Sequence, residues 1–197
     1  MDEPREPQVR QLDARSLRGL AHPLRMQLLD ALRFDGPATA SRLAEKLGES
    51  SGATSYHLRQ LAAHGFIEDD PERGKGKERW WKAAHKGLRF DDSLLTDTDP
   101  TVRGAADMYL HEVATTQTRD LSTWLGNRAS WPDEWNSVWD MSSATLRLTP
   151  ELTRELIEKM HALIDFYRDR ATDSDDAAQV RLHTRAFPLR TDQERPQ

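Results

Sequence analysis

The 197-residue sequence predicts an α+β fold that is mainly helical, with an N-terminal region of helices and a hairpin and a C-terminal helical region that carries a small β-sheet. Three observations predict this class. Apolar side chains recur every three or four residues along most of the chain, which is the period of helices packed on a core. After Gly65 the pattern changes to two short strands around a glycine-rich loop. After Pro100 a helical stripe runs for about seven turns.

The composition limits what the protein can be. No stretch approaches the ~18 uninterrupted apolar residues of a membrane span, and the N-terminus has no apolar secretion signal, so we expect a cytoplasmic protein without membrane contact. Cysteine is absent, which excludes disulfides, thiolate metal sites and a cysteine nucleophile. No nucleophile motif, phosphate loop or histidine-rich metal motif is present, so we expect no enzyme activity, no cofactor and no metal.

The net charge of −5 is divided unevenly along the chain. Residues 1–90 hold 16 Lys/Arg and 13 Asp/Glu, whereas residues 91–197 hold 12 and 20. The first half can therefore face phosphate, while the acidic half serves self-association or a ligand. We divide the chain into a flexible arm, a first domain, a linker, a second domain and a disordered tail, at residues 1–13, 14–90, 91–99, 100–190 and 191–197.

The first domain begins with a series of helices. The apolar stripe between residues 14 and 34 is interrupted at Pro23, which predicts a short helix, a corner and a second helix with Pro23 in its first turn. Gly48 ends the next, shorter helix. Ser50 is a suitable N-cap for a further helix that runs through Ala63.

The outward face of this last helix has a composition that suits contact with DNA. Small residues lie near its start and hydrogen-bonding residues along its side, namely Ser51, Gly52, Ser55, Tyr56, Arg59 and Gln60. A recognition helix needs this layout because its first turns approach base edges closely and its polar side chains read the major groove. A solvated helix surface would look similar. We expect His57 to support the helix or to touch phosphate rather than to bind metal.

A basic hairpin follows. Residues 66–70 and 78–84 have the pattern of strands, and from Arg73 to Arg89 there are seven Lys/Arg and one Glu. This pattern predicts a wing whose cations contact the DNA backbone, namely Arg73, Lys75, Lys77 and Arg79. The alternative is a soluble loop without a ligand. Trp80 and Trp81 alternate, so one of them should pack beneath the wing.

The order of these elements resembles the ArsR family of winged helix-turn-helix repressors. The likeness lies in the segments LAHPLRMQLLDAL, SRLAEKLG, SSGATSYHLRQLAAHGFIE and GKGKERWWKA, within residues 14–90. The resemblance implies a winged-helix fold and a repressor that binds double-stranded DNA. The metal sensors of that family bind through cysteine thiolates, which this chain lacks, so the identity of any small-molecule effector stays open.

The second domain is predicted to begin with a dimerisation helix. The sequence from Asp97 to Pro100 is a helix-start signature, and an apolar stripe follows from Val102 to Leu125. A helix of this length seldom buries itself on one small domain, and two half-sites about one DNA turn apart need two linked copies. We therefore expect a homodimer on a palindromic operator. The alternative is a helix packed only within its own chain.

The remaining segments are less specific. Four tryptophans are candidates for the wall of a ligand pocket, with core packing as the alternative, namely Trp124, Trp131, Trp135 and Trp139. The last three are spaced by four, which predicts one side of a short helix. Alternation at residues 144–148 and 180–186 predicts two paired strands, joined by a helix from Thr149 with a buried face. His161 and Asp165 share a face of that helix but lack a third ligand for a metal.

Together these patterns predict a sequence-specific DNA-binding transcriptional regulator. The alternative is a winged-helix adaptor that binds proteins and has no DNA target. The basic hairpin favours the regulator, because an adaptor has no need for such a charge. An enzyme with a helical catalytic half has no support in the motifs of the sequence.

Overall fold

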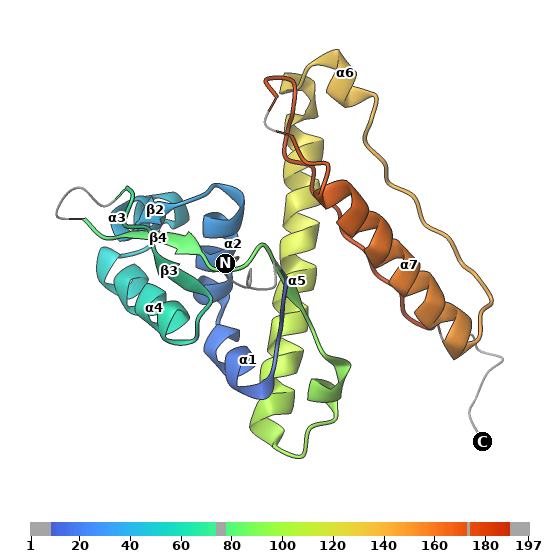
Figure 1. Ribbon diagram of the computed structural model, residues 1–197, viewed down its shortest axis with the longest axis horizontal. Coiled ribbons are helices and arrows are strands. Elements are labelled where there is room, and N and C mark those ends of the chain that lie inside the picture. Colours follow the sequence, from blue (N-terminus) through green and yellow to red (C-terminus); the bar gives the residue numbers. More distant parts are fainter. Residues whose placement is uncertain (1–8, 74–77, 173, 190–197) are drawn as a thin grey trace, which may run out of the picture. The chain divides into compact units, whose positions relative to one another are not determined.

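The computed structural model describes residues 9–73, 78–172 and 174–189, and the chain divides into two compact units, Met1–Trp124 and Leu125–Gln197. Each unit is described by itself. The elements of the first unit are β1 (Val9–Gln11), α1 (Ala14–Leu20), α2 (Pro23–Phe34), β2 (Ala38–Thr39), α3 (Ala40–Leu47), α4 (Ser51–Ala63), β3 (Ile67–Asp69), β4 (Trp80–Ala83), β5 (Gly87–Arg89), η1 (Asp92–Leu95) and most of α5 (Pro100–Asn127) (Figure 1).

Local sequence determines where α1 and α2 begin. The Asp13 carboxylate accepts the backbone N–H of Ser16 at 2.7 Å, and the Ser16 hydroxyl accepts the N–H of Asp13 at 2.9 Å, which is a reciprocal cap. At the start of α2, Nδ1 of His22 accepts the N–H of Leu24 at 3.2 Å and Pro23 fills the first turn. The corner predicted at Pro23 is confirmed.

Three residues, Gly48 to Ser50, separate the end of α3 from the start of α4. The cap residue of α3, Gly48, has φ 69°, a left-handed conformation that glycine adopts without steric cost. The hydroxyl of Ser50 then accepts the N–H of Ala53 at 3.2 Å and starts α4. Both predictions, the stop at Gly48 and the cap at Ser50, are confirmed. The result is a helix-turn-helix.

The sheet of the first unit has the order β2-β4-β3, with antiparallel pairing throughout. Thr39 of β2 faces Trp80, and Ile67 of β3 faces Ala83. Strands β3 and β4 are therefore the predicted hairpin. The connection between them is residues 70–79, and its residues 74–77, which include Lys75 and Lys77, lie outside the described residues.

Strands β1 and β5 form a separate parallel pair. β1 lies within the segment that the sequence indicated as a flexible arm. It is held because the guanidinium of Arg10 donates to the carbonyl of His64 at 2.7 Å and lies 4.5 Å from the ring centre of Phe66. The next apolar residue, Leu12, is buried in the core. Composition alone gave no sign of these long-range contacts.

The core of the first unit includes the start of α5. Val102, Ala106 and Tyr109 of α5 are buried in the same cluster as Leu58 of α4. Tyr109 stacks on Phe90 with ring centroids 5.7 Å apart, and burial raises the pKa of its phenol to about 12. The boundary between the units accordingly falls within α5 rather than in the linker expected at residues 91–99.

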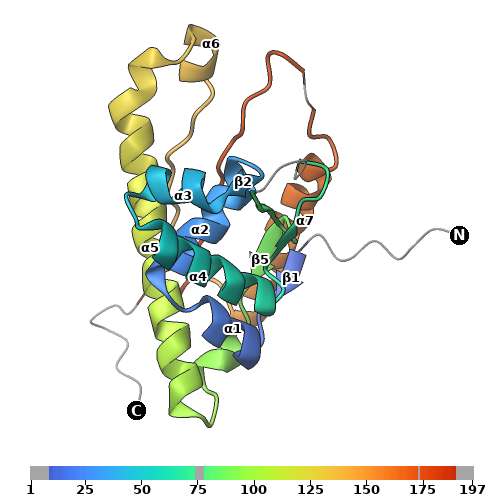
Figure 2. The ribbon, with the colours of Figure 1, turned by 90° about the vertical axis from the view of Figure 1, so that its left-hand side faces the viewer.

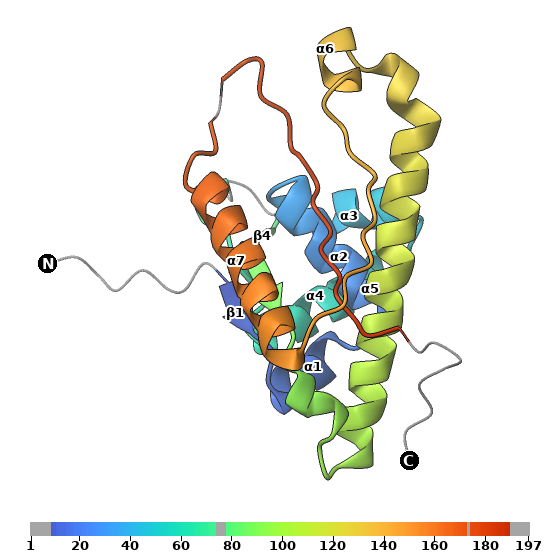
Figure 3. The same ribbon diagram turned by 90° about the vertical axis from the view of Figure 1, so that its right-hand side faces the viewer.

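The second unit contains η2 (Arg128–Ser130), α6 (Asp133–Asn136) and α7 (Pro150–Arg168), and Figure 3 shows the long non-helical segments before and after α7. Thr149 caps α7 as predicted, because its hydroxyl accepts the N–H of Leu152 at 3.3 Å. Between residues 125 and 189, none of the described residues is buried. The sequence predicted a buried face for α7. That prediction is wrong, because no side chain of α7 is buried within this single chain.

The mainly helical α+β class is confirmed, but the sheet predicted for the C-terminal region is wrong. Residues 144–148 and 180–186 form no strand, and the sheets lie in the first unit. Leu146 and Val180 are 61% and 74% exposed, so no buried face holds these segments in a common register. Alternation describes one strand and does not specify its partner. In the described part of the chain, no helix has the length and apolarity that a membrane crossing requires.

Candidate nucleic-acid interface

The second helix of the helix-turn-helix presents a polar face to solvent. Figure 2 shows α4 beside α3 on the outside of the first unit. The sequence-predicted residues of α4 are exposed or half-buried, namely Ser51, Gly52, Ser55, Tyr56, Arg59 and Gln60. Thr54, Leu58 and Leu61 lie on the opposite side and are fully buried. The helix is thus fixed to the core by one face, and the other is open to a ligand.

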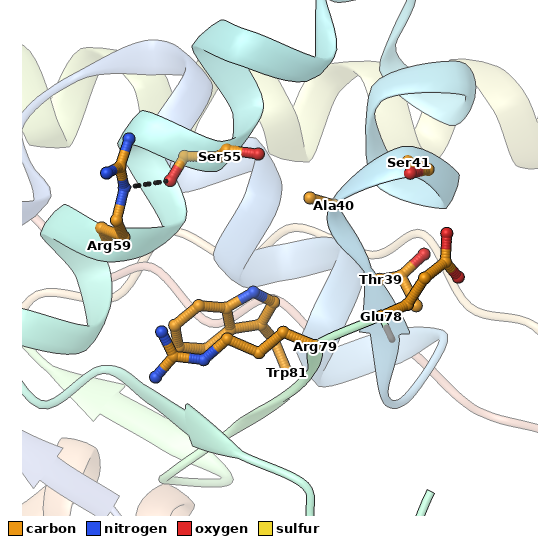
Figure 4. Close-up of a pocket in the computed structure, with 8 residues that line it drawn as sticks. All are labelled: Thr39, Ala40, Ser41, Ser55, Arg59, Glu78, Arg79 and Trp81. Atoms are coloured by element: carbon orange, nitrogen blue, oxygen red, sulfur yellow. Dashed lines mark hydrogen bonds between the residues drawn. The ribbon is translucent and has the colours of Figure 1, made fainter. Parts of the chain in front are cut away.

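A cavity of about 260 Å³ lies between this helix and the hairpin (Figure 4). Its lining comes from the end of β2 and the start of α3, from the side of α4, and from β4 with the two residues before it, namely Thr39, Ala40, Ser41, Ser55, Arg59, Glu78, Arg79 and Trp81. The fold therefore brings three sequence-predicted residues, Ser55, Arg59 and Arg79, to one hollow. The Nε of Arg59 donates to the carbonyl of Ser55 at 3.2 Å, which holds the side chain along α4.

Arg79 is held by two neighbours on the hairpin. Its guanidinium makes two hydrogen bonds to the Asp69 carboxylate, one of them from Nη2 to Oδ2 at 2.7 Å. It also lies over the ring of Trp81, 4.0 Å from the ring centre. The hydrogen bonds from Arg79 lower the pKa of the Asp69 carboxyl. This cation thus already has an anionic partner within its own chain.

The two tryptophans of β4 have different environments. Trp81 is buried beneath the hairpin, which confirms that one of the two packs there. Trp80 is half-buried, and the guanidiniums of Arg42 and Arg73 lie 5.0 Å and 5.8 Å from its ring centre. Arg73 also pairs with Asp70 at 3.7 Å.

Sequence reasoning missed Arg42 and Ser41 of α3 as neighbours of this surface. Ser41 lines the cavity, and Arg42 lies over Trp80. They come there because the two-residue strand β2 pairs with β4 directly before α3 begins. A strand of two residues has too little alternation to be recognised in a sequence. A basic residue in the first turn of the first helix of a helix-turn-helix was the one available signal for Arg42.

His57 of α4 packs against the start of α2. Its ring centroid lies 4.3 Å from that of His22, the residue that caps α2. Burial lowers the pKa of both imidazoles, and the positive charge of Arg25 lowers them further. His57 therefore joins α4 to α2, in line with the supporting role expected of it. Among the described residues, no three His, Asp or Glu side chains gather where they could hold a metal ion.

The four tryptophans proposed for a ligand pocket are divided between the units. Trp124 is half-buried at the end of the first unit, and the other three belong to the second. Trp131 and Trp135 make an edge-to-face contact with centroids 6.1 Å apart. The single helix expected for three indoles is wrong, because α6 ends at Asn136 and Trp139 lies beyond it. None of these four residues lines the cavity beside α4, so the ligand pocket stays a prediction.

A helix-turn-helix followed by an antiparallel hairpin, on a core closed by further helices, defines a winged helix-turn-helix domain. Residues 20–70, under half of the chain, match the family model of a helix-turn-helix domain. A search of the curated proteins found no match.

Several solved structures are similar to this chain. They include reduced HlyU from Vibrio cholerae, with 21% identity, 48% of this chain and 78% of that chain covered, and a TM-score of 0.30. A winged helix-turn-helix domain of Mb0332 from Mycobacterium bovis, described as homodimeric and as a possible ArsR-family transcriptional regulator, has 22% identity, coverages of 54% and 81%, and a TM-score of 0.34. An apo mutant of ZitR from Lactococcus lactis has 18% identity, coverages of 76% and 85%, and a TM-score of 0.31. At these TM-scores the likeness adds nothing to an argument about function, which rests on the chain's own residues.

Proposed function

We propose that the protein is a sequence-specific DNA-binding transcriptional regulator of the ArsR type, which places α4 in the major groove. The observation that carries this proposal is the position of α4, which is fixed to the core through Leu58 and Leu61 and presents small and polar residues on its other face. Small residues in the first turns let the backbone approach base edges, and Arg59 and Gln60 are side chains that read guanine and adenine. The cavity beside α4 brings Arg59 of this helix and Arg79 of the hairpin to one hollow.

The hairpin supplies the contacts to the DNA backbone in this proposal. Its cations are Arg73, Lys75, Lys77 and Arg79, and contacts of this kind fix register without reading sequence. The second candidate, a protein-binding adaptor, is less well supported because it gives no reason for seven Lys/Arg and one Glu between residues 73 and 89.

Replacement of both Lys75 and Lys77 by alanine is expected to weaken binding to all duplex sequences alike. Each lysine that neutralises a phosphate releases about one counterion, so the slope of log affinity against log salt should fall by roughly 2 for the pair. Gel-shift titrations at several salt concentrations measure this slope. The control is Lys159→Ala, which removes a lysine from α7. A loss confined to one sequence would contradict a backbone role.

We also propose that the regulator is a homodimeric repressor that binds a palindromic operator. The second half of α5 supports this, since Leu121 and Leu125 are 36% and 43% exposed and lie four residues apart on one helix face. Two apolar side chains on one helix face are positions that a second copy of the helix can cover. A second copy covers Leu121 and Leu125 and sets the two α4 helices about 34–36 Å apart, the spacing of successive major grooves.

Glutamate at both Leu121 and Leu125 is expected to shift the protein to monomer and to lower operator affinity at least tenfold, because a single copy reads only one half-site. Sedimentation velocity measures the mass, and gel shift measures the affinity. Glutamate at Arg119 and Thr123, an equally spaced pair on the opposite side of α5, is the control. The dimer would be refuted if the Leu121/Leu125 variant kept the sedimentation coefficient of the wild type.

Selection of genomic fragments by the purified protein tests the function itself. We expect enrichment of fragments that share a pseudo-palindromic sequence and are released by added salt. A protein that retains no fragment even at low salt would leave the adaptor as the better account.

A further inference from the structure

Arg79, one of the two arginines that line the cavity, is already occupied. Both hydrogen bonds of its fork go to the Asp69 carboxylate, and its guanidinium lies over the ring of Trp81. In Figure 4 the guanidinium ends on the same side of the cavity as Arg59. A phosphate that reaches this hollow therefore meets a cation whose charge is balanced by a neighbouring carboxylate.

The pair can open when a competitor arrives. The Arg79 and Asp69 side chains are 57% and 52% exposed, and an ion pair between exposed groups contributes little to stability because water screens it. A phosphate offers oxygens of the same geometry as a carboxylate to the arginine fork. Asp69 and an incoming phosphate thus compete for the same N–H groups, and their negative charges repel one another.

We propose that Asp69 is a built-in competitor of the DNA phosphate for Arg79 and lowers the affinity of the hairpin for the backbone of any duplex. This inference rests on the proposed function and names an inhibitory contact within the same surface. Asp69 does not itself read DNA; it acts through Arg79. The carboxylate keeps a cationic hairpin from binding every sequence tightly, so that the base contacts of α4 account for a larger share of the affinity.

The neighbouring residue on the same strand provides a matched control. Glu68 carries the same charge, pairs with Lys82 at 3.2 Å, and lies opposite Lys82 in the strand register, whereas Asp69 lies opposite Trp81. Successive residues of a strand point to opposite faces of the sheet. Glu68→Gln therefore changes the net charge as Asp69→Asn does, on the face away from Arg79.

The experiment measures affinity for a random-sequence duplex over a range of salt concentrations. Asp69→Asn is expected to raise affinity roughly three- to tenfold at low salt and to steepen the salt slope by about 0.9, the contribution of one phosphate. Glu68→Gln should change both quantities much less. In the Arg79→Ala background, Asp69→Asn should give no gain, because the competed cation is gone.

Each outcome decides a different point. Equal gains from Asp69→Asn and Glu68→Gln would reduce the effect to net charge and overturn the competition. A loss of affinity in Asp69→Asn would instead make Asp69 a residue that positions Arg79 for phosphate. In both cases the wild type still binds DNA, and the proposed function stands. Absence of any salt-dependent binding by the wild type would overturn the proposed function and this inference together.

Discussion

Replacement of Arg59 by alanine is expected to weaken binding to the selected operator by about 1–3 kcal/mol and to relax the preference at one base position. Arg59 is exposed on α4, and its Nε bond to the Ser55 carbonyl leaves the outer nitrogens of the guanidinium for a base edge. Arginine makes two hydrogen bonds to guanine O6 and N7, and this pairing discriminates against other bases.

Gel shifts with operators substituted at single base pairs measure this effect. The wild type should lose affinity when the contacted base is changed, while the Arg59→Ala variant should no longer respond to that change. Arg15→Ala removes an exposed arginine from α1 and is the control for general loss of charge. An equal loss on every operator would show that Arg59 contacts the backbone rather than a base.

Gly19→Ala is expected to destabilise the first unit by about 1–3 kcal/mol, the cost of overpacking a core. Gly19 is buried at the end of α1, where a methyl group would lie 2.6 Å from Cδ2 of His64 and closer still to Cγ and Nδ1. Cγ lies on the axis about which the imidazole ring turns, so rotation of the ring about the Cβ–Cγ bond does not relieve the clash. The higher helix propensity of alanine, about 1 kcal/mol, offsets part of the cost.

Urea denaturation measures the change, and a second substitution tests its cause. His64→Ala removes the ring that the added methyl group would meet. In the His64→Ala background, Gly19→Ala should therefore lower the free energy of unfolding much less than it does in the wild type. If Gly19→Ala unfolds at the same urea concentration as the wild type, then α1 and the end of α4 do not approach as closely as described.

Much of the helical part of the fold could be predicted because its signals are local. Pro23, Gly48, Ser50 and Thr149 each act on the turn in which they lie, so a few neighbouring residues determine where a helix starts or ends. The outward face of α4 was likewise predictable, since Thr54, Leu58 and Leu61 define its buried side at helical spacing.

Features that depend on pairing between distant segments could not be predicted. β1 and β5 are paired strands that lie far apart in the sequence, since Val9 pairs with Gly87. β2 is only two residues long, so its pairing with β4 leaves little pattern in the sequence. Residues 144–148 show the same alternation as a strand but have no partner. The contact between Asp69 and Arg79 depends on strand register, and a shift by one residue would have placed Asp69 on the other face of the sheet.

The central claim, that α4 lies in the major groove, is tested most directly by methylation interference on the selected operator. Methylation of guanine N7 blocks the major-groove edge and leaves the minor groove unchanged. The account predicts interference at guanines in two clusters about 10 base pairs apart, one for each copy of α4. Binding that is insensitive to guanine N7 methylation throughout a guanine-containing operator would contradict it.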